Sequence, residues 1–113
     1  MRTFIFVQDV ARAFDTILHK GKVGQVYNIG SDNERSNLEI AVTLLEYFNL
    51  VDKKDQYLTF VQDRLFNDKR YAINSQKLHD LGWYPEVPFK QGIKITIDWY
   101  KDNMKNWENL NLH

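Results

Sequence analysis

Apolar and polar positions along the chain form segments that predict short strands alternating with helices. β-Branched and aromatic residues concentrate at 3–7, 25–30 and 57–61, and each of these runs predicts a strand. A stripe with helical spacing follows the first run. Its apolar members are Val10, Ala13, Phe14, Ile17 and Leu18. Asp9 is the expected N-cap of this helix, and residues 21–24 are its expected end and turn.

Three further helices are expected from start and stop signals. Ser36 and Glu39 form a capping box, which predicts a helix beginning there. A short helix is expected over 74–80 and closed by Gly82, and Pro88 suits the first turn of a last helix. Strands alternating with helices indicate an α/β class with a small sheet of about three strands. So thin a sheet suggests an incomplete unit.

Composition excludes several classes of protein. A length of 113 residues predicts one domain, and the 15 basic residues balance the 15 acidic residues, so no global charge attracts nucleic acid or a membrane surface. The absence of cysteine excludes disulfides and thiolate metal sites. No apolar run approaches the roughly 20 residues of a membrane span, and the first residues do not resemble a signal peptide. We therefore expect a soluble, cytoplasmic protein.

The usual catalytic patterns are missing from the sequence. The five glycines form neither a dinucleotide fingerprint nor a phosphate loop. No tyrosine has a lysine four residues later, so the pair that removes a proton from a sugar hydroxyl is lacking. His19, His79 and His113 are widely separated, and a structural or exposed role is expected for each. We expect no catalytic residue, no bound cofactor and no metal in this chain.

Polar residues gather on three segments that could hold an anion. Residues 63–71 follow the third predicted strand, where α/β proteins place ligands, and Arg64 offers a planar fork to phosphate oxygens. The helix start at Ser36 and Asn37 offers free N–H groups, and Arg2 precedes the first strand. The alternative for the 63–71 segment is a solvated ion-pair network, and for Asn37 an ordinary helix-start residue.

Taken in order, these segments resemble dTDP-glucose 4,6-dehydratases, which are extended short-chain dehydrogenase/reductases of the NAD-dependent epimerase/dehydratase family. The similarity runs over nearly the whole chain. It rests on an Arg-aromatic strand and helix at 2–13, on 24–30 with 33–38, on 63–71, on Lys77 with 81–85, and on 92–100. Single pieces also occur in other nucleotide-sugar epimerases and dehydratases, so the order and spacing of the pieces carry the resemblance.

The resemblance implies a fold, an activity and a site. Members of the family are lyases that use NAD to oxidise C4 of a nucleotide-bound glucose, eliminate water and return the hydride to C6. Their NAD and catalytic residues lie in an N-terminal Rossmann domain, and a smaller C-terminal lobe grips the nucleotide diphosphate. The positions that match nucleotide contacts are Arg2, Asn37, Arg64 and Asn67. The arginines would neutralise the diphosphate, and the amides would bind phosphate, ribose or base.

The resulting expectation is a truncated, nucleotide-sugar-binding C-terminal lobe over 1–105 with a polar tail over 106–113, without the Rossmann domain. It would be inactive alone and would bind a nucleotide-diphosphate sugar weakly, and the sequence does not show whether thymidine or uridine is preferred. Two alternatives are half of a split dehydratase that a Rossmann-domain chain complements, and an interaction or structural remnant with a vestigial site. A homodimer through 4–7 or the strand near Val61 is also expected, because apolar strand edges can pair.

Overall fold

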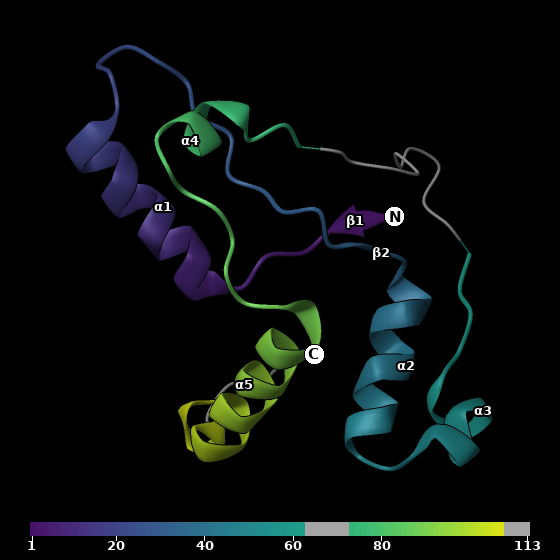
Figure 1. The fold of residues 1–113 in the computed structure, drawn as a ribbon. Helices are drawn as coiled ribbons and strands as arrows, with labels where there is room; N and C mark the ends of the chain where they lie inside the picture. Colours follow the sequence, from purple (N-terminus) through teal and green to yellow (C-terminus); the bar gives the residue numbers. More distant parts are fainter. Residues whose placement is uncertain (63–72, 108–113) are drawn as a thin grey trace.

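A computed structural model describes residues 1–62 and 73–107. The ordered elements are two short strands, five α-helices and two 3-10 turns (Figure 1). Their bounds are β1 Arg2–Thr3, α1 Val7–Lys20, β2 Glu34–Arg35, α2 Asn37–Tyr47, η1 Val51–Lys53, α3 Lys54–Tyr57, α4 Gln76–Asp80, α5 Phe89–Asp102 and η2 Met104–Asn106. The strands β1 and β2 form one antiparallel pair. The protein is therefore a small mixed helix and sheet structure.

The predicted sheet of about three strands is wrong for the described residues. The run over 3–7 contributes only its first residue to β1, the run over 25–30 has no ladder, and Tyr57 ends α3. A strand needs a hydrogen-bonding neighbour, and Val26, Phe60 and Val61 are 72%, 84% and 85% exposed. Within the part of the chain that the structure describes, these residues have the composition of a strand but no neighbouring strand.

Helix boundaries follow the sequence signals with two corrections, at Pro88 and at Asp9. The capping box of α2 is confirmed, and so is Gly82, which follows α4 with φ of +91°. Pro88 occupies the N-cap of α5 rather than its first turn. The predicted N-cap role of Asp9 is wrong, because α1 begins at Val7 with Phe6 as its N-cap. The Asp9 side chain is buried and binds a different segment.

A small hydrophobic core lies where α4 meets α1 (Figure 1). Ala13, Leu78 and Trp83 are each at most 1% exposed, and five partly buried residues surround them: Ile5, Ile17, Tyr27, Ile29 and Leu81. The Trp83 indole Nε1 donates to the Asp9 carbonyl oxygen at 3.0 Å, so the ring is buried without losing its hydrogen bond. We refer to this cluster as the α1–α4 core.

A second packing unit joins α2 to α5 on the other side of the strands (Figure 1). Leu45 and Ile97 are buried, and the Tyr47 hydroxyl donates to the Asp98 carboxylate. The radius of gyration is 17.3 Å, whereas a compact domain of about 100 residues has a value near 13 Å. The chain is therefore less compact than an ordinary domain of its size. No helix within the described ranges is long and apolar enough to span a bilayer.

Candidate functional site

The β1–β2 pair brings the start of the chain to the start of α2. Arg2 lies opposite Arg35, and Thr3 lies opposite Glu34. The approach continues past the strands, since the Phe4 N–H donates to the Asn33 carbonyl oxygen at 2.9 Å. Arg35 stands two residues before Asn37, the first residue of α2, so the pairing places Arg2 beside the start of that helix.

The N-terminus of α2 is closed by its own capping box. The Glu39 N–H donates to Ser36 Oγ at 3.1 Å, and the Ser36 N–H donates to Glu39 Oε2 at 2.7 Å. Two backbone donors are thus used, and a carboxylate sits where the helix dipole would otherwise attract an anion. The helix end alone is a weak anion site, so the exposed Asn37 side chain is the group this helix start can offer to a ligand.

Two of the four predicted site residues are brought together. Arg2 and Asn37, far apart in sequence, both lie at the junction of the strand pair with α2. Arg64 and Asn67 lie outside the described residues. Arg35 lies at the same junction, opposite Arg2. The sequence analysis did not name it, because nothing in the sequence shows which residue pairs with Arg2.

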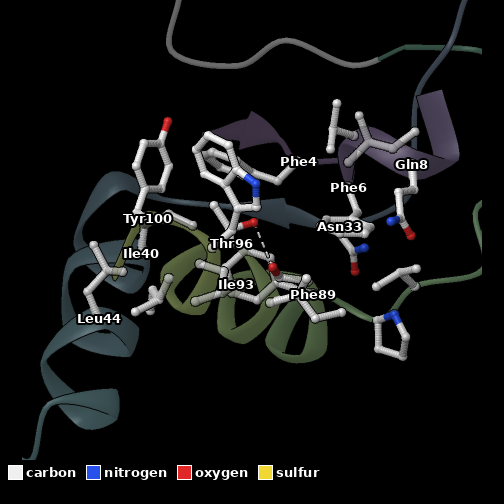
Figure 2. A pocket seen from close by; sticks show the side chains of 18 residues that line it. Phe4, Phe6, Gln8, Asn33, Ile40, Leu44, Phe89, Ile93, Thr96 and Tyr100 are labelled. Atoms are coloured by element: carbon white, nitrogen blue, oxygen red, sulfur yellow. Dashed lines mark hydrogen bonds between the residues drawn. The ribbon is translucent and has the colours of Figure 1, made fainter. Parts of the chain in front are cut away.

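An apolar groove of about 670 Å³ opens beside this junction, between the chain leaving β1, α2 and α5 (Figure 2). Figure 2 shows Phe4, Phe89 and Ile93 on its walls, with Ile40 and Leu44 approaching from α2. The rings of Phe4 and Phe89 meet edge to face with centroids 6.1 Å apart. The volume falls within the range of small-molecule sites, which are mostly apolar with a few polar groups.

Few polar side chains reach the groove. Asn33 and Gln8 lie at one end, and the Thr96 hydroxyl is already bonded to the Gly92 carbonyl oxygen at 2.8 Å (Figure 2). None of these groups pairs a nucleophile with a base, so the groove offers contact surface rather than chemistry. No three His, Cys, Asp or Glu side chains converge as metal ligands within 1–62 and 73–107.

The buried carboxylate of Asp9 is a structural group. Its oxygens accept from Arg12 Nη2 at 2.8 Å and from the backbone N–H groups of Glu86 at 3.1 Å and Val87 at 3.0 Å. Burial alone raises the pKa of Asp9, but the hydrogen bonds from Arg12, Val87 and Glu86 outweigh it and hold the pKa below its ordinary value. Asp9 therefore fastens α1 to the segment that leads into α5.

The comparisons with known proteins assign the chain to a family of sugar-nucleotide enzymes. A sequence model described as GDP-mannose 4,6 dehydratase matches residues 1–96, so the chain belongs to that family. It is 45% identical over 111 residues to a dTDP-D-glucose 4,6-dehydratase of Bos taurus and 44% identical over 112 residues to that of Homo sapiens, with 96% of this chain covered in each case.

A plant relative broadens the comparison. The chain is 41% identical over 107 residues to a trifunctional UDP-glucose 4,6-dehydratase/UDP-4-keto-6-deoxy-D-glucose 3,5-epimerase/UDP-4-keto-L-rhamnose-reductase of Arabidopsis thaliana, with 95% of this chain covered. The chain spans 31% and 32% of the two mammalian relatives and 16% of the plant protein. Both a thymidine and a uridine sugar nucleotide thus appear among the names of its relatives.

Proposed function

We propose that this chain is the nucleotide-sugar-binding lobe of a dTDP-glucose 4,6-dehydratase-like protein, and that it carries no catalytic group of its own. The observation that supports this most is the strand register. It brings Arg2 to the start of α2, where Asn37 lies, so two of the residues matched to nucleotide contacts share one junction. An arginine fork and an amide are suited to diphosphate and ribose oxygens.

Arg64 and Asn67 complete the proposed site from the 63–71 segment. Arg64 would bind the diphosphate, and Asn67 would hydrogen-bond phosphate, ribose or base. Asn67 stands where the family commonly has histidine, and Leu65 and Phe66 replace a Pro-Gly pair, so the amide would contact the nucleotide differently from the family's ring.

Direct titration tests the site. Isothermal titration or ligand-observed NMR of the chain with dTDP-glucose and UDP-glucose should show a Kd no tighter than about 100 µM, because part of the family's cleft is contributed by other segments. NAD should not bind, since its fingerprint glycines are missing from the sequence. Binding of NAD with similar affinity would contradict the assignment.

A pair of arginine variants separates the site from the ion-pair alternative. Arg64→Ala should weaken nucleotide-sugar binding by about 1.5–3 kcal/mol if its bond to phosphate is charge-assisted. Arg70→Ala, in the same segment, should change binding far less. Equal curves for Arg64→Ala and the unmodified chain would place the site elsewhere, and equal losses in both variants would favour a diffuse charged patch.

A second candidate function, half of a complemented dehydratase, is favoured by the apolar groove. The two mammalian relatives are about three times as long as this chain. A groove of about 670 Å³ lined by Phe4, Ile93 and Trp99 is the kind of surface that another folded segment covers. The occupant we propose is the remainder of the dehydratase polypeptide, in the same or a separate chain.

Turnover distinguishes the two candidates. The chain alone, with dTDP-glucose and NAD, should form no 4-keto sugar, since hydride transfer and C4 deprotonation have no carrier in its sequence. Complementation predicts that 4-keto sugar appears when a polypeptide spanning the other two-thirds of the bovine relative is added. Turnover by the chain alone would refute the first proposal, and no complex with the added polypeptide would refute the second.

A further inference from the structure

The strand register sets two arginines side by side. Residues directly opposite in an antiparallel pair point to the same face, with Cβ atoms about 4.5–5.5 Å apart, so Arg2 and Arg35 project together. Like charges in that position repel each other and destabilise the pair. An anion that contacts both side chains would offset this repulsion.

Arg35 is held in place by an aromatic ring. Its guanidinium carbon lies 4.9 Å from the centroid of Phe89, the first residue of α5, and Phe89 in turn meets Phe4 edge to face. A guanidinium stacked on a ring keeps the edges of its plane open, and its N–H donors point outward from those edges. The side chain is therefore positioned before any ligand arrives.

Among the described residues, no carboxylate forms an ion pair with Arg35. Its neighbour Glu34 is opposite Thr3 and projects to the other face of the pair. Glu39 is engaged by the capping box of α2. The inference requires only the position of Arg2, whatever other contacts that side chain makes.

We propose that Arg35 is a further cationic arm of the nucleotide site, besides the arginines already assigned to it, and that Arg2 and Arg35 together clamp the diphosphate group from one face of the strand pair. This inference rests on the proposed function for the identity of the ligand. The family match assigns no role to Arg35, and the register supplies one. Two guanidinium forks on one face can each donate to a different phosphoryl oxygen, as a diphosphate requires. Phe4 and Phe89 also line the apolar groove, so the clamp lies at its edge.

Charge and fork geometry are tested separately at Arg35. Arg35→Gln removes the charge and should weaken binding of dTDP by about tenfold or more. Arg35→Lys keeps the charge but loses the fork, and it should fall between Arg35→Gln and the unmodified chain. Lys54→Gln is the control, because Lys54 is an exposed cation at the start of α3, and it should bind dTDP like the unmodified chain.

Inorganic pyrophosphate separates failure of the clamp from failure of the proposed function. Pyrophosphate should raise the Tm of the unmodified chain, and this rise should be lost in Arg35→Gln. A pyrophosphate effect that depends on Arg35, without any binding of dTDP or UDP, would keep the clamp and overturn the nucleotide assignment. Equal dTDP affinity in Arg35→Gln and the unmodified chain would overturn the clamp and keep the assignment. No response of the unmodified chain to either anion would overturn both.

Discussion

The α1–α4 core and the α2–α5 unit differ in how completely their apolar side chains are buried and their polar groups hydrogen-bonded. In the α1–α4 core, Leu78 and Trp83 are fully enclosed, and even the buried Asp9 carboxylate has three donors. In the α2–α5 unit, Leu44 is 36% exposed and Trp99 49% exposed, and their apolar surface faces an open groove. The α1–α4 core is packed like a protein interior. The α2–α5 unit has the apolar composition of an interior, but part of its apolar surface is open.

This contrast separates stability from function. A residue in the α1–α4 core contributes mainly by excluding water and satisfying hydrogen bonds, so its removal should cost unfolding free energy. A residue lining the groove has less to lose when the chain is alone. Its contribution should appear when another polypeptide segment covers the groove.

The largest expected effect comes from removing the buried carboxylate. Asp9→Ala leaves the backbone N–H groups of Glu86 and Val87 without their acceptor and removes one of the acceptors of Arg12, so it should lower the free energy of unfolding by about 3–5 kcal/mol. Asp15→Ala on the same helix, where the side chain is 74% exposed, should change it by about 0.5 kcal/mol or less. Chemical denaturation measures both, and similar small changes in the two variants would contradict the role of Asp9.

The pH dependence of stability gives the same residue a second test. Because the pKa of Asp9 is lower in the folded state, its stabilisation is present above the ordinary carboxyl pKa of about 4 and is lost as the pH falls through the folded value. Asp9→Asn cannot titrate, so its unfolding free energy should fall less steeply in acid. Parallel acid profiles for Asp9→Asn and the unmodified chain would show that other carboxylates account for acid unfolding.

The next largest expected effect on the free energy of unfolding is seen when one leucine from each unit is replaced by alanine. Leu78→Ala should cost about 2–4 kcal/mol, because the side chain is fully buried and a cavity remains. Leu44→Ala should cost less than about 1 kcal/mol in the chain alone, because its side chain is already partly in water. Denaturant midpoints for the two variants decide the comparison. Equal losses would show that the groove is as well packed as the core.

Local signals made the helices predictable from the sequence. A capping box, a glycine after α4 and a proline before α5 each act within a few residues, and all three mark real boundaries. The strands were mispredicted because a strand exists only with a partner, and composition names no partner. Asp9 was mispredicted as an N-cap because an acidic residue ahead of an apolar stripe is the usual signal for one. The backbone N–H groups that it binds lie 77 and 78 residues away, so the sequence does not reveal them.

The candidate site divides in the same way. Arg2 and Asn37 were candidate anion contacts from their places in the sequence, and the resemblance to the dehydratases assigned them to the nucleotide. Arg35 could not be found from the sequence, because what singles it out is its strand pairing with Arg2. Pairing between residues 33 positions apart is not visible in the sequence. The charge sequence around it, acidic at Glu34 and polar at Ser36, is equally typical of an ordinary helix start.

The smallest expected effect is weak self-association. Pairing of β1 edges is disfavoured, since the strand has only two residues and carries a charge at Arg2. The groove, and the outward face of α1 with Phe14 64% exposed, are the surfaces that a second copy can cover. A neutral chain adds no net repulsion between copies. We therefore expect self-association through the groove, which unlike a single helix face is hollowed and can receive side chains.

Light scattering behind a sizing column at about 100 µM should then show an average mass above the 13.5 kDa of one chain. Ile40→Glu places a charge on the groove wall and should return the mass to that of a monomer, whereas Phe14→Glu should leave it raised. If Phe14→Glu alone abolishes association, the outward face of α1 is the interface. A strictly monomeric unmodified chain would contradict self-association through the groove.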